Sequence, residues 1–348
     1  MSTNLGQSIS FFSGARKNPY NQKWSFGLQH QLPYQWLVDI SYVGSRTTRL
    51  NLNRNLNFTP AQYLSRLPYR DQPTINYLSQ LFPNPFRGTN PIYGANASRA
   101  GLLQPYPHFG SVTVVSEPMG YSWYNAMQLR VERRFAQGYT FQLSYTWSKA
   151  MEATEFLNVS DPVPYRSLAG VDRTHRLVMS GIYELPFGRG RRFGSAWRPA
   201  LNFIAGGWQL NGVVQRQSGP ALGWGNIIFN GDIKNIPLPK DQRSVQRWFN
   251  IDAGFNRNSV QQLASNIRTF PLRFGGIRAD GQARWDFSAI KNFPITEGIR
   301  MQFRGETFNA WNHPNLNAPA TSPTSSAFGL ITGQDQPRSW QFALKLEF

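Results

Sequence analysis

The sequence predicts an all-β fold, namely an antiparallel transmembrane β-barrel segment with long extracellular loops and short periplasmic turns. Apolar and polar residues alternate along several segments of the chain. Many of these segments have about ten residues, the length that a tilted strand needs to cross a bilayer. The connections between them are alternately short and long, which fits the two ends of a barrel in an outer membrane.

Alternation is clearest between Tyr139 and Ser148, where aromatic and apolar residues occupy every second position and Thr, Gln and Ser occupy the others. The residues from Trp340 to Phe348 repeat the pattern. In a strand each set lies on one face, whereas a helix would scatter both sets around its circumference. Both segments are therefore predicted to be strands with one apolar and one polar face.

Nine segments have strand character in this sense. They cover residues 23–32, 36–45, 121–135, 139–150, 175–187, 203–218, 283–293, 299–311 and 338–348. A weaker tenth candidate lies between Gln7 and Phe12. Because bacterial single-chain barrels have even strand numbers, nine strands favour a portion of a larger barrel. A closed ten-stranded barrel is the less favoured alternative.

The connections differ in length in a regular order. Short ones cover residues 33–35 and 136–138 and a turn that begins near Pro294 and includes residues 296–298. Long ones cover residues 46–120, 151–174, 219–282 and 312–337, and residues 188–202 form a connection of intermediate length. If Phe348 lies in the periplasm, every short turn lies there too. A soluble β-sandwich, the alternative fold, gives no reason for this asymmetry.

Seven tryptophans lie near the ends of the predicted strands, where the membrane interface favours an apolar ring with one polar atom. They are Trp24, Trp36, Trp123, Trp147, Trp208, Trp285 and Trp340. In the soluble alternative they would be ordinary core aromatics.

The composition narrows the class of protein. The net charge of +18 fits a partner such as nucleic acid or anionic lipid, but only 16% of residues are charged and 14% are aromatic. The densest basic run, Arg189 to Arg192, is short, so we expect no nucleic-acid partner. The chain has no cysteine, which excludes disulfides and thiolate sites.

The start of the chain lacks the basic and apolar stretches of a secretory signal peptide. An outer-membrane protein needs such a peptide, so the expectation is that the parent protein has further N-terminal residues. No apolar run of about 18 residues is present, which excludes a transmembrane helix.

Enzymatic motifs are missing from the sequence. The four histidines have no i, i+4 pair, and there is no phosphate loop, Gly-x-Ser-x-Gly or EF-hand pattern. Glu152, Glu155 and Asp161 are predicted to be loop carboxylates without an evident partner. We expect no enzymatic activity, no metal site and no cofactor. His175 and His313 are expected to bond to neighbouring backbone.

Alternation also indicates which polar residues face inward, where they would line a lumen or contact a plug. These are Gln128, Arg130, Glu132, Arg134, Gln142, Ser144, Gln209, Asn211, Gln215, Gln302, Arg304 and Glu306. Solvation of the lumen and cross-strand pairing explain them without a ligand. The first long loop carries arginines that suit phosphate groups of lipopolysaccharide or an anionic ligand, although a solvated loop is the simpler reading. They are Arg46, Arg49, Arg54, Arg66, Arg70, Arg87 and Arg99.

Several stretches together resemble the C-terminal barrel of TonB-dependent receptors, in particular the Oar-like branch. They begin with Leu143-Ser-Tyr-Thr-Trp-Ser-Lys149, Asp172-Arg-Thr-His-Arg-Leu-Val178 and Tyr183-Glu-Leu-Pro-Phe-Gly-Arg-Gly-Arg191. Gly207-Trp-Gln-Leu-Asn-Gly212, Arg216-Gln-Ser-Gly-Pro220, Trp285-Asp-Phe-Ser288, Phe308-Asn-Ala-Trp-Asn-His-Pro314 and the terminal Phe348 follow. The resemblance implies a 22-stranded barrel, a plug, energy input through TonB, and in the Oar-like branch an N-terminal carboxypeptidase-regulatory-like module.

On this resemblance, residues 1–348 are expected to be the C-terminal portion of such a barrel in the cell outer membrane, without its plug and N-terminal domains. The expected function is uptake of an unidentified bulky solute. TonB would act only through the missing N-terminal parts. A non-transport adhesin or structural barrel is the first alternative, and a soluble basic β-protein that binds nucleic acid is the second.

The end of the chain carries a further signal. Barrel precursors are recognised through a last strand that ends in an aromatic residue, and such a strand can pair its edge with an assembly protein. The expected signal consists of Trp340, Phe342, Leu344, Leu346 and Phe348. The expected partners are therefore the barrel-assembly machinery, outer-membrane lipid and lipopolysaccharide.

Overall fold

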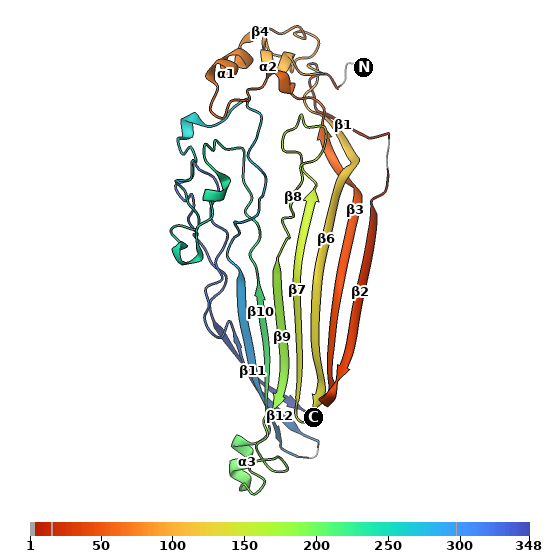
Figure 1. The fold of residues 1–348 in the computed structure, drawn as a ribbon, viewed down its shortest axis with the longest axis vertical. Coiled ribbons are helices and arrows are strands. Elements are labelled where there is room, and N and C mark those ends of the chain that lie inside the picture. Colours follow the sequence, from red (N-terminus) through yellow and green to blue (C-terminus); the bar gives the residue numbers. More distant parts are fainter. Residues whose placement is uncertain (1–3, 15–16, 297) are drawn as a thin grey trace.

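A computed structural model describes residues 4–14, 17–296 and 298–348, and its main feature is a long, curved antiparallel sheet (Figure 1). The sheet has eleven strands, nine of which follow one another in the order of the chain. These nine are β2 (Tyr20–Leu32), β3 (Trp36–Asn55), β6 (Val112–Ala136), β7 (Tyr139–Ala153), β9 (His175–Glu184), β10 (Trp208–Gln217), β11 (Gln282–Pro294), β12 (Arg300–Phe308) and β13 (Ser339–Glu347). They correspond to the nine predicted strands, which confirms the fold class.

The smaller elements lie at the two ends of this sheet. Towards one end are β1 (Ile9–Phe12), β4 (Leu81–Pro83), β5 (Asn96–Ser98), β8 (Ser167–Leu168), α1 (Gln72–Ser79) and α2 (Arg99–Leu102). At the other end, beside the C-terminus, lies α3 (Pro199–Ala205) (Figure 1). No helix in the described ranges is long and apolar enough to cross a membrane.

Several predicted boundaries were wrong. β3 runs on to Asn55 and β6 begins at Val112, because the two strands keep pairing beyond the segment with strict alternation. The prediction of a strand from residue 203 failed because residues 203–205 belong to α3, which begins at Pro199. Proline fits the first turn of a helix, where its missing N–H has no partner to lose.

The candidate strand between Gln7 and Phe12 exists in part as β1, but it is not a tenth wall strand. β1 pairs in parallel with the upper extension of β6, with Ile9 opposite Val112. The outermost strands of the sheet path are β2 and β13, and they do not pair with each other. The described sheet is therefore open and is not a closed ten-stranded barrel.

The register gives the sheet one apolar face and one polar face. Trp36, Arg133 and Phe141 are direct neighbours across three strands, and Gly181 and Gly212 continue the same row. Large apolar side chains of this face are open to the surroundings, with exposed fractions of 69% for Phe26 and 68% for Phe342. An apolar outer face beside a polar inner face is the arrangement of a membrane barrel. We call these two faces the outer and the inner face.

Aromatic rings cover glycines on the outer face. Trp24 lies opposite Gly44, and a Cβ atom on Gly44 would overlap its indole ring. Phe287 and Phe342 lie in the same way over Gly212 and Gly305, at 3.0 and 3.4 Å from the position of such a Cβ. These pairs bury glycine backbone that lipid would otherwise contact, as aromatic rings do at glycines in other sheets.

The end of the sheet that holds the C-terminus has short connections. Positive φ angles permit tight reversals there. They occur at Tyr34 and Gln35 between β2 and β3, and at Gln137 and Gly138 between β6 and β7. The buried Arg133 joins the two turns, because its Nε donates to the carbonyl oxygen of Tyr34 at 3.1 Å and its Nη2 to the side chain of Gln137 at 3.2 Å. The predicted turn near Pro294 is also present, although Glu297 and the first three residues of the chain lie outside the described residues.

The opposite end carries the long connections, as predicted from the alternation of loop lengths. We call the connections 56–111, 154–174, 218–281 and 309–338 together the cap. All four lie at one end of the sheet, whereas the connection 185–207 with α3 lies at the other (Figure 1). Among the described residues, the cluster of buried hydrophobic side chains lies in the cap and not in the sheet.

Candidate functional site: the cap and the inner face

Aromatic packing holds the longest cap connection in place. Trp224 lies at the centre, with ring centroids of Phe249, Phe255 and Phe270 at 5.3, 5.5 and 5.6 Å. Phe328 of the last connection packs on Phe249 and Phe255, at 5.2 and 5.0 Å. Each such pair stabilises by about 0.5–1.5 kcal/mol beyond its buried area. The cap is thus a packed body and not a set of solvated loops.

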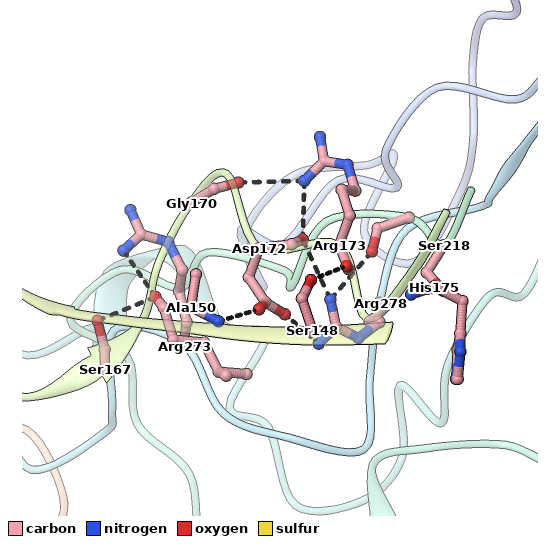
Figure 2. A network of polar contacts seen from close by, with 12 residues as sticks. Ser148, Ala150, Ser167, Gly170, Asp172, Arg173, His175, Ser218, Arg273 and Arg278 are labelled. Carbon is pink, nitrogen blue, oxygen red and sulfur yellow. Dashed lines mark hydrogen bonds and ion pairs between the residues drawn. The ribbon is translucent and has the colours of Figure 1, made fainter. Parts of the chain in front are cut away.

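A buried ion pair ties the cap to the strands. The carboxylate of Asp172, which is only 1% exposed, accepts from Arg278 at 2.5 Å and from the backbone N–H of Ala150 at 2.6 Å. Arg278 also donates to the carbonyl oxygen of Gly219 at 3.1 Å. Figure 2 shows Asp172 enclosed between the end of β7 and Arg278. Because Asp172 and Arg278 come from different cap connections, their contact fixes one against the other.

Neighbouring groups extend this network. Ser148 donates to the carbonyl oxygen of Arg173 at 2.9 Å, and Arg173 donates to that of Gly170 at 3.3 Å (Figure 2). Burial, and then the positive charge of Arg278, lowers the pKa of Arg173.

All three carboxylates that were predicted to lie in loops without a partner have one, and Glu152 lies in β7, so that prediction was wrong. Arg273 contacts Glu152 at 3.2 Å and Glu155 at 3.5 Å. Asp161 accepts from the backbone N–H of Asn158 at 2.8 Å. Sequence could not show these pairs, since the arginine lies more than a hundred residues away from both glutamates.

The cap connections also bond to one another. Asn158 donates to the carbonyl oxygen of Arg268 at 3.2 Å and accepts from its backbone N–H at 2.7 Å. Burial lowers the pKa of Arg268, while the charge of Glu155 acts in the opposite direction. Asn266 donates to the carbonyl oxygens of Leu67 and Tyr69 at 3.1 and 3.2 Å. With Phe328 of the last connection packed on Phe249 and Phe255, all four connections therefore form one body.

Five of the seven arginines predicted for the first loop lie in a strand or are engaged within the cap. Arg46, Arg49 and Arg54 lie in β3, so their assignment to a loop was wrong. Arg70 donates to the carbonyl oxygen of Gln262 at 3.0 Å, and Arg99 lies over the ring of Tyr77 at 3.8 Å. These two side chains are occupied within the cap. Binding of a phosphate group by the arginines of this loop stays a prediction.

The predicted inward-facing polar residues lie on the inner face and largely contact each other. Arg130 contacts Glu132 at 2.6 Å, and Arg304 contacts Glu306 at 3.8 Å. Gln209 donates to Asn211 at 2.8 Å. These three contacts lie within single strands, and Asn211 and Gln302 also bond across strands to Ser288 and Asn292 at 3.0 and 2.9 Å. Pairing of this kind requires no ligand.

A polar cavity of about 300 Å³ lies where the inner face meets the cap. Its lining consists of Gln215, Gln282, Arg284, Asn309, Asn315, Asp335 and Gln336. Of these, only Gln215 was predicted, because the others belong to strand ends and cap segments without a periodic pattern. The cavity presents hydrogen-bond donors and acceptors at the end of the inner face.

The two histidines at strand ends have neighbouring partners. His175 shares a hydrogen bond of 2.8 Å with the hydroxyl of Tyr145, and its backbone N–H donates to Ser218 at 3.2 Å. The backbone of His313 bonds to the side chain of Asn309. Within residues 4–14, 17–296 and 298–348, no group of three acidic, histidine or cysteine side chains is placed to hold a metal ion.

Four residues of the predicted assembly signal lie on the outer face of β13, and Phe348 follows directly after its last residue. Their exposed fractions are 59% for Trp340, 68% for Phe342, 67% for Leu344, 56% for Leu346 and 99% for Phe348. β13 is an outermost strand, so one of its edges has no neighbour in the described sheet. The position suits the predicted role, which stays a prediction.

A membrane-spanning sheet with a packed cap at one end and a polar inner face defines the wall of an outer-membrane barrel. Residues 1–341 match the family described as the outer membrane beta barrel domain, and the chain belongs to this family. The protein is therefore an outer-membrane protein. A comparison with curated proteins found no match.

Solved structures of outer-membrane transporters have a similar fold. The transporter YddB from Escherichia coli is 8% identical with a TM-score of 0.47, and the alignment covers 99% of this chain and 34% of that one. FpvA of P. aeruginosa, solved with a pyoverdine–iron complex, is 11% identical with a TM-score of 0.40, and the alignment covers 94% of this chain and 27% of that one. The iron transporter FrpB of Neisseria meningitidis is 9% identical with a TM-score of 0.42, and the alignment covers 97% of this chain and 33% of that one. The chain spans about a third of the length of these proteins.

Proposed function

We propose that the chain forms part of the wall and the outer cap of a TonB-dependent uptake protein for a bulky solute. The observation that carries this proposal is the polar cavity between the inner face and the packed cap. A solute captured by the cap would enter at this cavity and then meet the polar inner face. The chain has no proposed catalytic role and no proposed cofactor.

In this proposal, residues 1–348 are the C-terminal portion of the barrel, and other strands of the same protein pair with the open edges of β2 and β13. Unpaired edges are unfavourable in hydrocarbon, because their backbone groups find no hydrogen-bond partner there. A plug and a TonB-contacting segment would belong to the remainder of the protein. The barrel-assembly machinery would recognise β13 and its terminal aromatic residue.

Uptake measurements in cells that carry the complete protein test this function. We would follow labelled oligosaccharides, peptides and ferric chelates, with and without an active tonB gene, and compare Arg284→Ala with Arg247→Ala. Arg284 lines the polar cavity, whereas Arg247 lies in an exposed ion pair of the cap. We expect one solute class whose uptake requires TonB and falls several-fold in Arg284→Ala only.

Uptake that does not depend on TonB would overturn the energy input, and unchanged uptake in Arg284→Ala would overturn the role of the cavity. Binding of cells to surfaces or to other cells, without uptake of any of the three solute classes, would favour the adhesin alternative.

A further inference from the structure

We propose that the outer face carries a binding site for the phosphate group of a glycolipid headgroup in the outer leaflet. The site is a cavity of about 580 Å³ formed by the middle of β7, by the upper ends of β9, β10 and β11 and by two cap connections. This inference goes beyond solute uptake and does not rest on it, because the row of strand residues that includes Arg216 lies on the outer face, and only the strand-end residues Gln217 and Gln282 reach towards the inner side.

The register places the cavity on the lipid side. Tyr145, Leu177, Arg216 and Ala283 are successive neighbours across β7, β9, β10 and β11, and all four line the cavity. Tyr145 belongs to the apolar set of β7, so this row lies on the outer face. Arg216 thus occupies a position where alternation calls for an apolar residue.

The height of the row along the strands matches a membrane interface. Arg216 is the penultimate residue of β10, and its partner Ala283 is the second residue of β11. Trp285 pairs with Val214, which is one outward position nearer the middle of the strands. Tryptophan prefers the interface, so Arg216 lies at or just beyond the level where hydrocarbon ends and headgroups begin.

The lining is cationic and not internally neutralised. Arg216, Lys240 and Arg243 contribute three positive charges, and Asp280 is the single carboxylate among the lining residues. Both oxygens of Asp280 are engaged, since they accept from the backbone N–H groups of Gly281 at 2.9 Å and Leu316 at 3.3 Å. No ion pair within the described part of the chain involves any of the three cations.

Arg243 is held in place for such a ligand. Its Nε donates to the carbonyl oxygen of Leu238 at 2.8 Å, and its guanidinium lies 5.9 Å from the ring centroid of Trp248. These contacts leave the terminal N–H groups of Arg243 available as donors. Guanidinium and ammonium donors recognise phosphate, and two arginines can each donate two hydrogen bonds to it.

Size and surroundings select the ligand class. A volume of about 580 Å³ accommodates a phosphorylated sugar, which is much larger than a bare phosphate ion. The side chains of Tyr145, His175 and His313 supply further polar atoms and rings around the cations. A phosphorylated sugar with acyl chains, as in lipopolysaccharide, would place its chains against the apolar outer face below the cavity.

Lipid retention by the purified complete protein tests the site. The protein is equilibrated in detergent with lipopolysaccharide, separated from free lipid, and its bound lipid phosphate is counted by mass spectrometry. The variant carries Arg216→Gln, Lys240→Gln and Arg243→Gln. The matched control carries Arg130→Gln, Arg134→Gln and Arg304→Gln, which remove the same charge from the inner face.

We expect the affinity for lipopolysaccharide to fall about fivefold for each cation removed from the cavity. The inner-face control should keep the affinity of the unmodified protein, and dephosphorylated lipopolysaccharide should bind all three proteins equally weakly. Arg216→Lys with Arg243→Lys should restore part of the affinity in a folded protein, because the charge remains while the bidentate donors are lost.

Equal losses in the cavity variant and the inner-face control would overturn the site, as would no loss in either. Inorganic phosphate, titrated as a competitor, should displace lipopolysaccharide only at far higher concentration. If it binds the cavity as tightly as the lipid does, the ligand is a soluble phosphate and the lipid assignment is wrong.

Discussion

At the scale of single residues, the contact between Asp172 and Arg278 joins sequence positions that no pattern relates. Asp172 stood in a family-like stretch, but its burial and its partner followed only from the fold. Arg216 is the opposite case, because alternation assigns it to the outer face of a strand and marks it as an exception. A charged residue at an apolar position was thus a readable signal, whereas a long-range ion pair was not.

Removing one member of the buried pair should loosen the cap. Arg278→Met leaves the Asp172 carboxylate buried without its cation, which typically costs about 3–5 kcal/mol. We expect trypsin to cleave the connection 154–174 much faster in this variant, measured by mass spectrometry on protein in lipid vesicles. Asp172→Asn combined with Arg278→Met should restore part of the resistance, because no unpaired charge remains.

The control for that experiment is Arg247→Met, which opens an exposed ion pair between Arg247 and Asp252 at 3.2 Å. Exposed pairs contribute about 0–1 kcal/mol, so its cleavage should match that of the unmodified protein. Similar protease sensitivity of Arg247→Met and Arg278→Met would show that the buried pair has no special role.

A second residue-scale prediction concerns the glycines beneath aromatic rings. Gly44→Ala places a methyl group where the ring of Trp24 lies, so the ring must move away and the packing between β2 and β3 weakens. We expect a loss of about 1–3 kcal/mol, the usual effect of overpacking, in urea unfolding of the vesicle-bound protein. Gly223→Ala, with open space around it, should unfold at the same urea concentration as the unmodified protein.

At the scale of elements, alternation predicted all nine strands because each has one face towards a different environment. It failed at strand ends for separate reasons. β3 and β6 continue beyond the membrane through irregular pairing around Leu50, where both sides meet water or protein and strict alternation ends. The segment of α3, Pro199 to Ala205, is short and apolar, and periodicity cannot separate such a helix from a strand.

The last strand gives an element-scale prediction. If β13 is the assembly signal, deletion of Phe348 removes the terminal aromatic without changing the paired residues of β13, which end at Glu347. We expect several-fold less protein in the outer-membrane fraction, measured by immunoblot with membranes separated by density. Gln341→Ala on the inner face should leave the amount unchanged, and equal insertion of all three proteins would contradict the signal.

At the scale of the whole molecule, the alternation of loop lengths predicted which connections share an end of the sheet, and that arrangement is confirmed. The interior of the cap was beyond prediction. Its aromatic core brings together Trp224, Phe249 and Phe328, which lie in two connections without regular strands or helices of the length that periodicity detects. Nothing in local sequence specifies which of these rings meet.

The sidedness of the membrane can be tested directly, because the chain has no cysteine of its own. Single variants Asn53→Cys at the upper end of β3 and Gln137→Cys in a short turn would be treated with a membrane-impermeant maleimide on intact cells. We expect labelling of Asn53→Cys only, and labelling of both after the outer membrane is permeabilised. Labelling of Gln137→Cys alone on intact cells would reverse the orientation.

Because the main aromatic core lies in the cap, the cap folds in water while the outer face of the sheet is surrounded by hydrocarbon. The cap buries its rings out of water, so unfolding of the cap should increase the heat capacity. The free energy of unfolding of the cap should also fall with urea concentration, as it does for a small globular domain. The outer face of the sheet stays in hydrocarbon and gains little from that effect. Heating the vesicle-bound protein should therefore give an early calorimetric transition from the cap, followed by a separate one from the sheet.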